Sequence, residues 1–228
     1  IVLFVVVGII RLIMKPRFII NNFTNLLHYL LRSLSIIYLL FYLLWGFNYY
    51  RQDYSVLAGM DDSPTTYNEL KEVTLIIIKK SNETRASLPE DDKGVLLIEE
   101  SFNDLGKMAN DGFDNYKLGS IDLSRSYGRV KPVFLSKYMS YTGIAGIYIP
   151  FTSEAMINTD IPNHSLLSAI SHEMAHQKGF AKEDEANFIA YKANINNPDQ
   201  RFQYSGYYLA MNYLMDEIFR ENPQVIHS

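Results

Sequence analysis

Residues 172–188 read HEMAHQKGFAKEDEANF, and this stretch decides both the fold and the chemistry. It begins with the pattern H-E-x-x-H, which is formed by His172, Glu173 and His176. Residues four apart lie on one face of a helix, so the two imidazoles can bind a single metal ion. Glu173 points toward the same side and can hold the attacking water without being a ligand. Zinc suits this set, because imidazole and carboxylate ligands are present and the chain has no cysteine.

A glycine turn follows the motif and predicts a second helix beside the first. The helix with the motif is predicted to begin near Asn163, as a possible N-cap, and to stop at Gly179. A new helix is predicted over residues 182–194. A catalytic zinc site uses three protein ligands, so one ligand is still missing, and the second helix can fold back to supply it.

Here the sequence resembles the zincin metallopeptidases, and among them the gluzincins, in which a glutamate on the next helix completes H-E-x-x-H. Residues 183–187, EDEAN, are similar to the E-x-x-A-D motif of several gluzincin families, with Asn as the last residue. The resemblance implies Glu183 as the third metal ligand, with Glu185 as the alternative. It implies Asn187 as the hydrogen-bonding partner of a ligating histidine. The alternative for both acids is a solvated first helical turn.

The same arrangement also looks like a family of uncharacterised bacterial membrane proteins. These have N-terminal transmembrane helices followed by an H-E-x-x-H domain. In that resemblance G-x-Y-x-P-F and Y-S-G-Y recur, here at residues 146–151 and 204–207. The resemblance covers most of the chain and names no substrate.

Residues 143–151, GIAGIYIPF, are the best candidate for a strand, and their Gly and Pro residues favour an edge. In gluzincins an edge strand beside the metal pairs with an extended peptide. The candidate substrate strand is Gly146, Ile147, Tyr148 and Ile149, and an ordinary core strand is the equal alternative. A donor that stabilises the oxyanion is also needed. Tyr204 is our first choice, and the other candidates are Tyr207, Arg201 and His164, each with ordinary packing or capping as its alternative role.

The rest of the domain is predicted from apolar spacing and from turn residues. Helices are expected over residues 65–80, 91–108 and 200–219, a loop over 110–129 and a strand over 130–135.

The first 50 residues differ from the rest in composition. Residues 1–10 carry no charge, and we expect a truncated transmembrane helix at about 1–14, with a buried core helix or a signal-peptide remnant as the alternative. A second transmembrane helix is expected at about 26–48. Basic residues between them, from Arg11 to Arg32, place this loop in the cytoplasm by the positive-inside rule. Residues 51–228 then form an extracytoplasmic domain.

Composition narrows the class of protein. Hydrophobic residues make up 48% of the chain and charged residues 20%, which excludes a disordered protein. The formal net charge of −4 argues against a general nucleic-acid binder. The absence of cysteine excludes thiolate metal sites and iron–sulfur clusters.

The sequence therefore predicts an α+β fold that is mostly helical, with N-terminal transmembrane helices and a zincin-like domain with a small edge-stranded sheet. The function expected is a zinc metallopeptidase of the bacterial cell membrane, multi-pass, with a peptide or protein substrate and Glu173 as general base. A non-catalytic zinc-binding sensor or assembly domain is the alternative. Polar residues around the motif argue against an intramembrane protease.

Overall fold

The computed structural model describes residues 23–61, 63–116 and 122–223. The chain divides into two units, which we describe separately. One unit is Ile1–Tyr50 with Pro150–Thr152, and the other is Arg51–Ile149 with Ser153–Ser228. The first predicted transmembrane helix, at about 1–14, lies outside the described residues.

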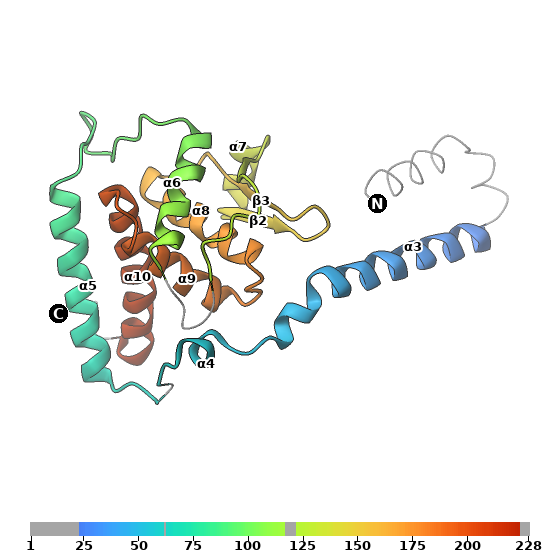
Figure 1. The fold of residues 1–228 in the computed structure, drawn as a ribbon, viewed down its shortest axis with the longest axis horizontal. Coiled ribbons are helices and arrows are strands. Elements are labelled where there is room, and N and C mark those ends of the chain that lie inside the picture. Colours follow the sequence, from blue (N-terminus) through green and yellow to red (C-terminus); the bar gives the residue numbers. More distant parts are fainter. Residues whose placement is uncertain (1–22, 62, 117–121, 224–228) are drawn as a thin grey trace. The chain divides into compact units, whose positions relative to one another are not determined.

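The first unit contains a long apolar helix, α3, at Phe23–Leu44 (Figure 1). Its segment Thr24–Leu44 has a mean hydropathy of 1.6 over its best window and buries none of that window in the protein. At about 1.5 Å per residue it has the length of a bilayer core. The prediction of one apolar helix long enough to span is confirmed. It ends before residue 48, because the chain continues as the 3₁₀ helix η1, Gly46–Tyr50.

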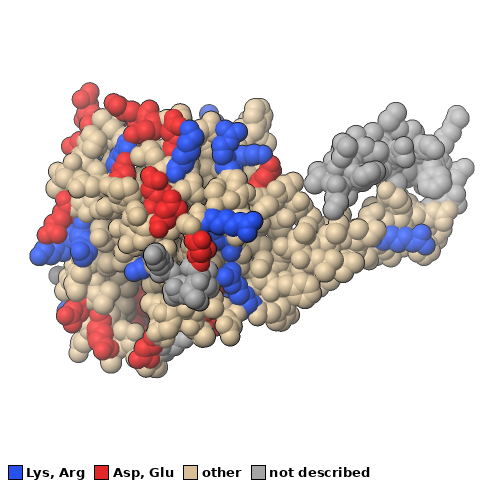
Figure 2. Space-filling model, viewed as in Figure 1, with Lys and Arg blue, Asp and Glu red and all other residues tan. Residues whose placement is uncertain are grey.

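Charge distinguishes this helix from the rest of the protein. Figure 2 shows acidic and basic side chains spread over the visible face of the second unit, and very few along α3. Arg32 is the one Lys or Arg of the helix, and Leu34 and Leu39 are more than half exposed. An apolar surface of this kind is stable in lipid and costly in water.

The second unit is mostly helical with one small sheet, as predicted. Four of its helices pack against one another, with α10 between α5 and α9, and α8 against both α9 and α10 (Figure 1). These helices are α5 Tyr67–Ala86, α8 Asn163–Gln177, α9 Glu183–Ile195 and α10 Gln200–Glu221. Short α4, Tyr54–Ala58, precedes them, and α6, Phe102–Asp114, covers α8 and α9.

The sheet has three short strands in the order β1-β3-β2. They are β1 Lys131–Pro132, β2 Gly146–Ile149 and β3 Glu154–Ile157, with α7 Ser136–Met139 and η2 Ser140–Thr142 between β1 and β2. β1 runs parallel to β3, and β2 runs antiparallel to it, with Gly146 opposite Ile157. β2 and β3 both pack on α8. Within the described residues β2 therefore lies at an edge of the sheet, as predicted, and carries all four residues of the candidate substrate strand.

Residues 91–101 are not helical, so the predicted helix over 91–108 is wrong in its first half. Asp91 accepts hydrogen bonds from the amides of Lys93 and Val95, and Gly94 has a φ of 75°. This turn competes successfully with the helix. The helix α6 begins instead after Ser101, whose side chain accepts a hydrogen bond from the amide of Asp104.

The helix α6 also extends to Asp114, into the segment that was predicted to be loop. Of the residues 130–135 that were predicted to form a strand, only Lys131 and Pro132 do so. One core joins α6, α8, α9, α10 and β3. Its fully buried large side chains include Phe113, Ile157, Leu167, Ile170, Phe180, Ile189 and Phe202.

Candidate metal centre

The end of α8 places the two histidines. Gly179 has a φ of 88°, which a residue with a Cβ rarely adopts. The amide of Gly179 donates to His176 O and that of Phe180 donates to Ala175 O, which is the Schellman pattern that ends a helix. This turn brings the carbonyl of Phe180 within 2.7 Å of His176 Nδ1. Nδ1–H therefore donates to Phe180 O, and Nε2 of His176 keeps its lone pair for another partner.

Three side chains converge at this point. His172 Nε2 lies 3.0 Å from His176 Nε2. The carboxylate of Glu183, on the first turn of α9, lies 3.1 Å from His172 Nε2 and 3.5 Å from His176 Nε2. One ligand atom from each of the three residues lies within 4.8 Å of the others. The structure thus brings together His172, His176 and Glu183, the three side chains that the sequence indicates first as candidate metal ligands.

The spacing of these atoms fits a metal ion. Two ligands of a tetrahedral zinc ion at about 2.0–2.1 Å lie about 3.3 Å apart, close to the spacing of the three atoms here. The donor set of two imidazoles and one carboxylate is one that zinc accepts in catalytic sites, and it leaves a fourth position for water or substrate. The residues present therefore fit a divalent metal ion, and the set also accepts cations other than zinc.

The pKa values of His172, His176 and Glu183 depend on one another. Burial alone would lower the pKa of His172, but its hydrogen bond to Glu183 and the nearby carboxylates raise it. Burial and the positive charge on His172 lower the pKa of His176. The hydrogen bond from His172 lowers the pKa of Glu183. A metal ion needs deprotonated ligand atoms, so metal binding at these three groups would depend on pH.

Glu173 is buried next to this cluster, with 4% of its surface exposed. Its Oε2 has no hydrogen-bond partner, and burial raises its pKa to about 7, against the opposing charge on His172. A buried carboxylate oxygen without a partner is costly, and packing alone does not account for a carboxylate in this position. It does not join the three converging ligand atoms, which agrees with its predicted role.

The backbone of β2 lies directly against Glu173. A Cβ placed on Gly146 would lie 2.5 Å from Glu173 Oε1, closer than any normal contact. The next aromatic residue of the strand, Tyr148, has its ring 6.4 Å from the ring of His176. The edge strand therefore passes beside both the general-base candidate and a ligand candidate, and Gly146 provides the space for the carboxylate.

Glu185, the alternative third ligand, lies away from the histidines. Its Oε1 accepts a hydrogen bond from the amide of Tyr54 at 2.8 Å, and Lys182 Nζ lies 3.9 Å from the same oxygen. Glu183 and Glu185 are two residues apart on α9, so their side chains point in different directions. The geometry selects Glu183.

Asn187 lies one turn after Glu183 and contacts His172. A hydrogen bond with its side chain contributes to the raised pKa of His172, as expected for a residue that orients a ligand. Its Nδ2 also donates to the hydroxyl of Tyr213 at 2.7 Å. The charge of Glu183 and burial raise the pKa of Tyr213. Tyr213 is thus a tyrosine of this site that the sequence analysis missed, because α10 is joined to the site only by the fold.

The side chains proposed from sequence for the oxyanion have their contacts elsewhere. The ring of Tyr204 lies 6.1 Å from that of Tyr208, and the ring of Tyr208 lies 4.3 Å from that of His164. Tyr207 faces the ammonium of Lys80 at 5.8 Å. These contacts favour the packing roles that were their alternatives.

Arg201 has a structural role. Its guanidinium donates two hydrogen bonds of 2.6 Å to Glu100 and binds Asp199 as well. These bonds lower the pKa of Glu100; burial alone would raise the pKa of Asp199, and hydrogen bonds from Arg201 more than offset it. The cluster joins the start of α10 to the segment before α6.

Replacement of Arg201 by Met is expected to lower the free energy of unfolding by about 1–3 kcal/mol at pH 7, less than for a fully buried pair because all three side chains are partly exposed. Both carboxyl pKa values are depressed, so their stabilisation is present at neutral pH and is lost as the pH falls through the folded-state values, below about pH 4. Urea unfolding at pH 7 and at about pH 2.5 checks this, because the stabilisation should be largely lost at the lower pH. The same loss at both pH values would contradict it.

Comparison with known proteins assigns the chain to a family. The whole chain, residues 1–228, matches the model of a family described as protein of unknown function, DUF3810, and the chain belongs to that family. No curated protein and no solved structure matches the chain.

Proposed function

We propose that this protein is a membrane-anchored zinc metallopeptidase that hydrolyses peptide bonds. The observation that supports this most strongly is the position of Glu173. Its unpartnered carboxylate lies beside three converging ligand atoms and against the edge strand β2. A structural zinc site needs neither a base nor a strand that can pair with a substrate.

Each residue near the site has a role in this proposal. His172, His176 and Glu183 hold the metal, which when bound polarises the scissile carbonyl and lowers the pKa of water. Glu173 accepts the proton of the attacking water at its free oxygen and later delivers it to the leaving amine. Its pKa of about 7, raised by burial, suits a group that both accepts and donates a proton near neutral pH.

Tyr213 takes the oxyanion role in place of Tyr204. Its hydroxyl accepts a hydrogen bond from Asn187, which leaves its own proton available for a second partner. Asn187 lies one helical turn after Glu183 on α9, so this hydroxyl lies close to the turn that carries a proposed ligand. A hydroxyl held in this way can donate to the oxygen on which negative charge develops.

The substrate binds along β2 as an added strand. One side of β2 pairs with β3, and within the described residues no strand pairs with the other side. Backbone hydrogen bonds to an extended peptide would supply affinity there without reading its sequence. Because Gly146 adjoins Glu173, such a peptide would pass close to the base.

The test is hydrolysis by the full chain, purified in detergent and loaded with zinc. Incubation with unfolded casein is expected to release new amino termini, detected by mass spectrometry. A chelator should stop the release, and added zinc should restore it. Zinc-loaded protein that releases no peptide from casein or from a mixed peptide library would contradict the proposal and support a non-catalytic zinc domain.

A further inference from the structure

The segment that follows the apolar helix contacts the connector between the two ligand helices. The connector is the segment Lys178–Lys182, which leads from α8 to α9. The contacting segment is Arg51–Tyr54, called the strap below, and it begins the second unit of the chain. No residue of the strap is among the three metal-ligand candidates.

The first half of the strap holds the turn that ends α8. Arg51 Nη1 donates to Lys178 O at 3.3 Å, and the guanidinium carbon lies 4.2 Å from the centre of the Phe180 ring. The carbonyl of Phe180 is the acceptor for His176 Nδ1. The strap thus contacts the residue that fixes the orientation of one proposed ligand.

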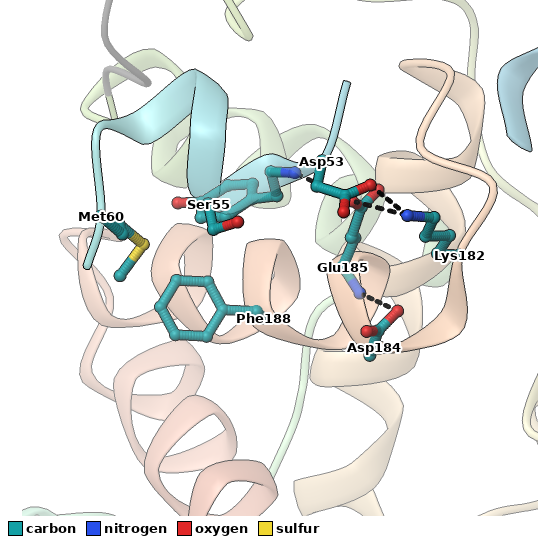
Figure 3. Close-up of a pocket in the computed structure, with 8 residues that line it drawn as sticks. Asp53, Ser55, Met60, Lys182, Asp184, Glu185 and Phe188 are labelled. Atoms are coloured by element: carbon teal, nitrogen blue, oxygen red, sulfur yellow. Dashed lines mark hydrogen bonds and ion pairs between the residues drawn. The ribbon is translucent and has the colours of Figure 1, made fainter. Parts of the chain in front are cut away.

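The second half of the strap holds the first turn of α9. Asp53 forms an ion pair with Lys182, and the amide of Tyr54, at the start of α4, donates to Glu185 (Figure 3). Figure 3 shows Asp53 and Glu185 pointing toward Lys182, and all three line one pocket. Lys182 and Glu185 lie on either side of Glu183 in the sequence. Through them the strap holds the turn that carries the proposed third ligand.

The side chain of Tyr54 contacts both the connector and α9. Its side chain is buried, with 6% exposed, and its ring lies 6.3 Å from that of Phe180 and 5.1 Å from that of Phe188. Phe180 belongs to the connector and Phe188 to α9, so the ring packs against both segments. Apart from the turn that ends α8, the connector forms no regular element, so contacts from other segments contribute to its position.

We infer that the strap is a positioning element of the metal site, which holds the connector so that His176 and Glu183 converge on one ion. The inference rests on the metal site of the proposed function but not on peptidase activity. It makes metal affinity depend on residues that touch no ligand.

The test measures the zinc affinity of the full chain in detergent by competition with a chromophoric chelator. Tyr54→Ala is expected to weaken zinc binding about 10- to 100-fold, as for other residues that orient ligands. Tyr54→Phe keeps the ring and the backbone amide, so it should bind zinc as the wild type does. Arg51→Met, at a partly exposed position, is a second variant that does not remove core packing and should weaken binding in the same direction.

Leu96→Ala controls for a general loss of stability. Leu96 is buried, and its carbonyl accepts from Asn163 at the start of α8, nine residues before His172. The Leu96→Ala protein should unfold more easily than the wild type but keep the zinc affinity of the wild type. The inference is overturned if Tyr54→Ala and Arg51→Met bind zinc as the wild type does, or if Leu96→Ala loses as much affinity as Tyr54→Ala. A wild type that binds no zinc would instead overturn the metal site itself.

Discussion

Replacement of Glu173 by Gln is expected to slow peptide hydrolysis by about 10²- to 10⁴-fold, the usual contribution of a general base. The amide has the shape of the carboxylate, but it cannot accept a proton from water. The fold should tolerate the change, because the carboxylate is buried, its Oε2 has no partner, and its pKa is already raised to about 7. Zinc affinity should remain close to that of the wild type, since Glu173 is not one of the three converging ligands.

The measurement is kcat on a fluorogenic peptide, together with zinc content, for the wild type and the variant. Glu83→Gln on α5 is a matched control, because its side chain is 64% exposed and its ion pair with Lys79 is a weak surface contact. The control should keep full activity. A Glu173→Gln protein that hydrolyses peptide at the wild-type rate would show that Glu173 is not the base.

The second large effect is expected for Gly146→Ala. The added Cβ would lie 2.5 Å from Oε1, 2.6 Å from Cγ and 2.8 Å from Cδ of Glu173, so either β2 or the carboxylate must move. A displacement of about 1 Å of a catalytic group can cost about 10²-fold in rate. We expect kcat to fall by about that factor. Zinc affinity should change much less, because no ligand atom is among the clashing atoms.

Gly143→Ala separates this clash from a general effect of a methyl group before β2. Gly143 has a φ of 71°, and a Cβ there would meet no atom within 4 Å. It should cost about 1 kcal/mol of stability through backbone strain and leave kcat unchanged. Wild-type kcat in Gly146→Ala would mean that the strand is not held against the base.

The elements that local patterns determine were predictable. The helices α8, α9 and α10 follow from apolar spacing and from caps such as Gly179, because each begins and ends with local signals. His172, His176 and Glu183 were found because all three lie within 12 consecutive residues on two adjoining helices. Neighbours in sequence on such helices are neighbours in space.

The predictions that were wrong concern segments in which a local turn competes with a helix, or in which contacts between distant residues decide the structure. Residues 91–101 have helical apolar spacing, yet the turn around Asp91 and Gly94 satisfies their backbone differently. Gly112 was taken as part of a loop, but it lies in α6 where a Cβ would come within 2.3 Å of Ala193 O, so it allows close packing of two helices. Composition alone does not distinguish a glycine of this kind from a turn glycine.

Two residues near the candidate site, Tyr213 and Tyr54, could not be predicted from local sequence patterns. Tyr213 lies 26 residues after Asn187, and Tyr54 contacts Phe180 across more than 100 residues. No local spacing relates these pairs, since the packing of α10 and α4 on α9 brings them together. The sequence therefore predicted the three candidate ligands and Asn187, whereas Tyr213 and Tyr54 emerged only from the fold.

The most direct test of the central claim is a crystal structure of the zinc-loaded protein, with anomalous scattering measured at the zinc edge. We expect one peak at about 2.0–2.2 Å from His172 Nε2, His176 Nε2 and a carboxylate oxygen of Glu183, with the fourth position open to solvent and Glu173 beside it. A peak elsewhere, a site completed by Glu185, or a fourth protein ligand closing the site would contradict this account.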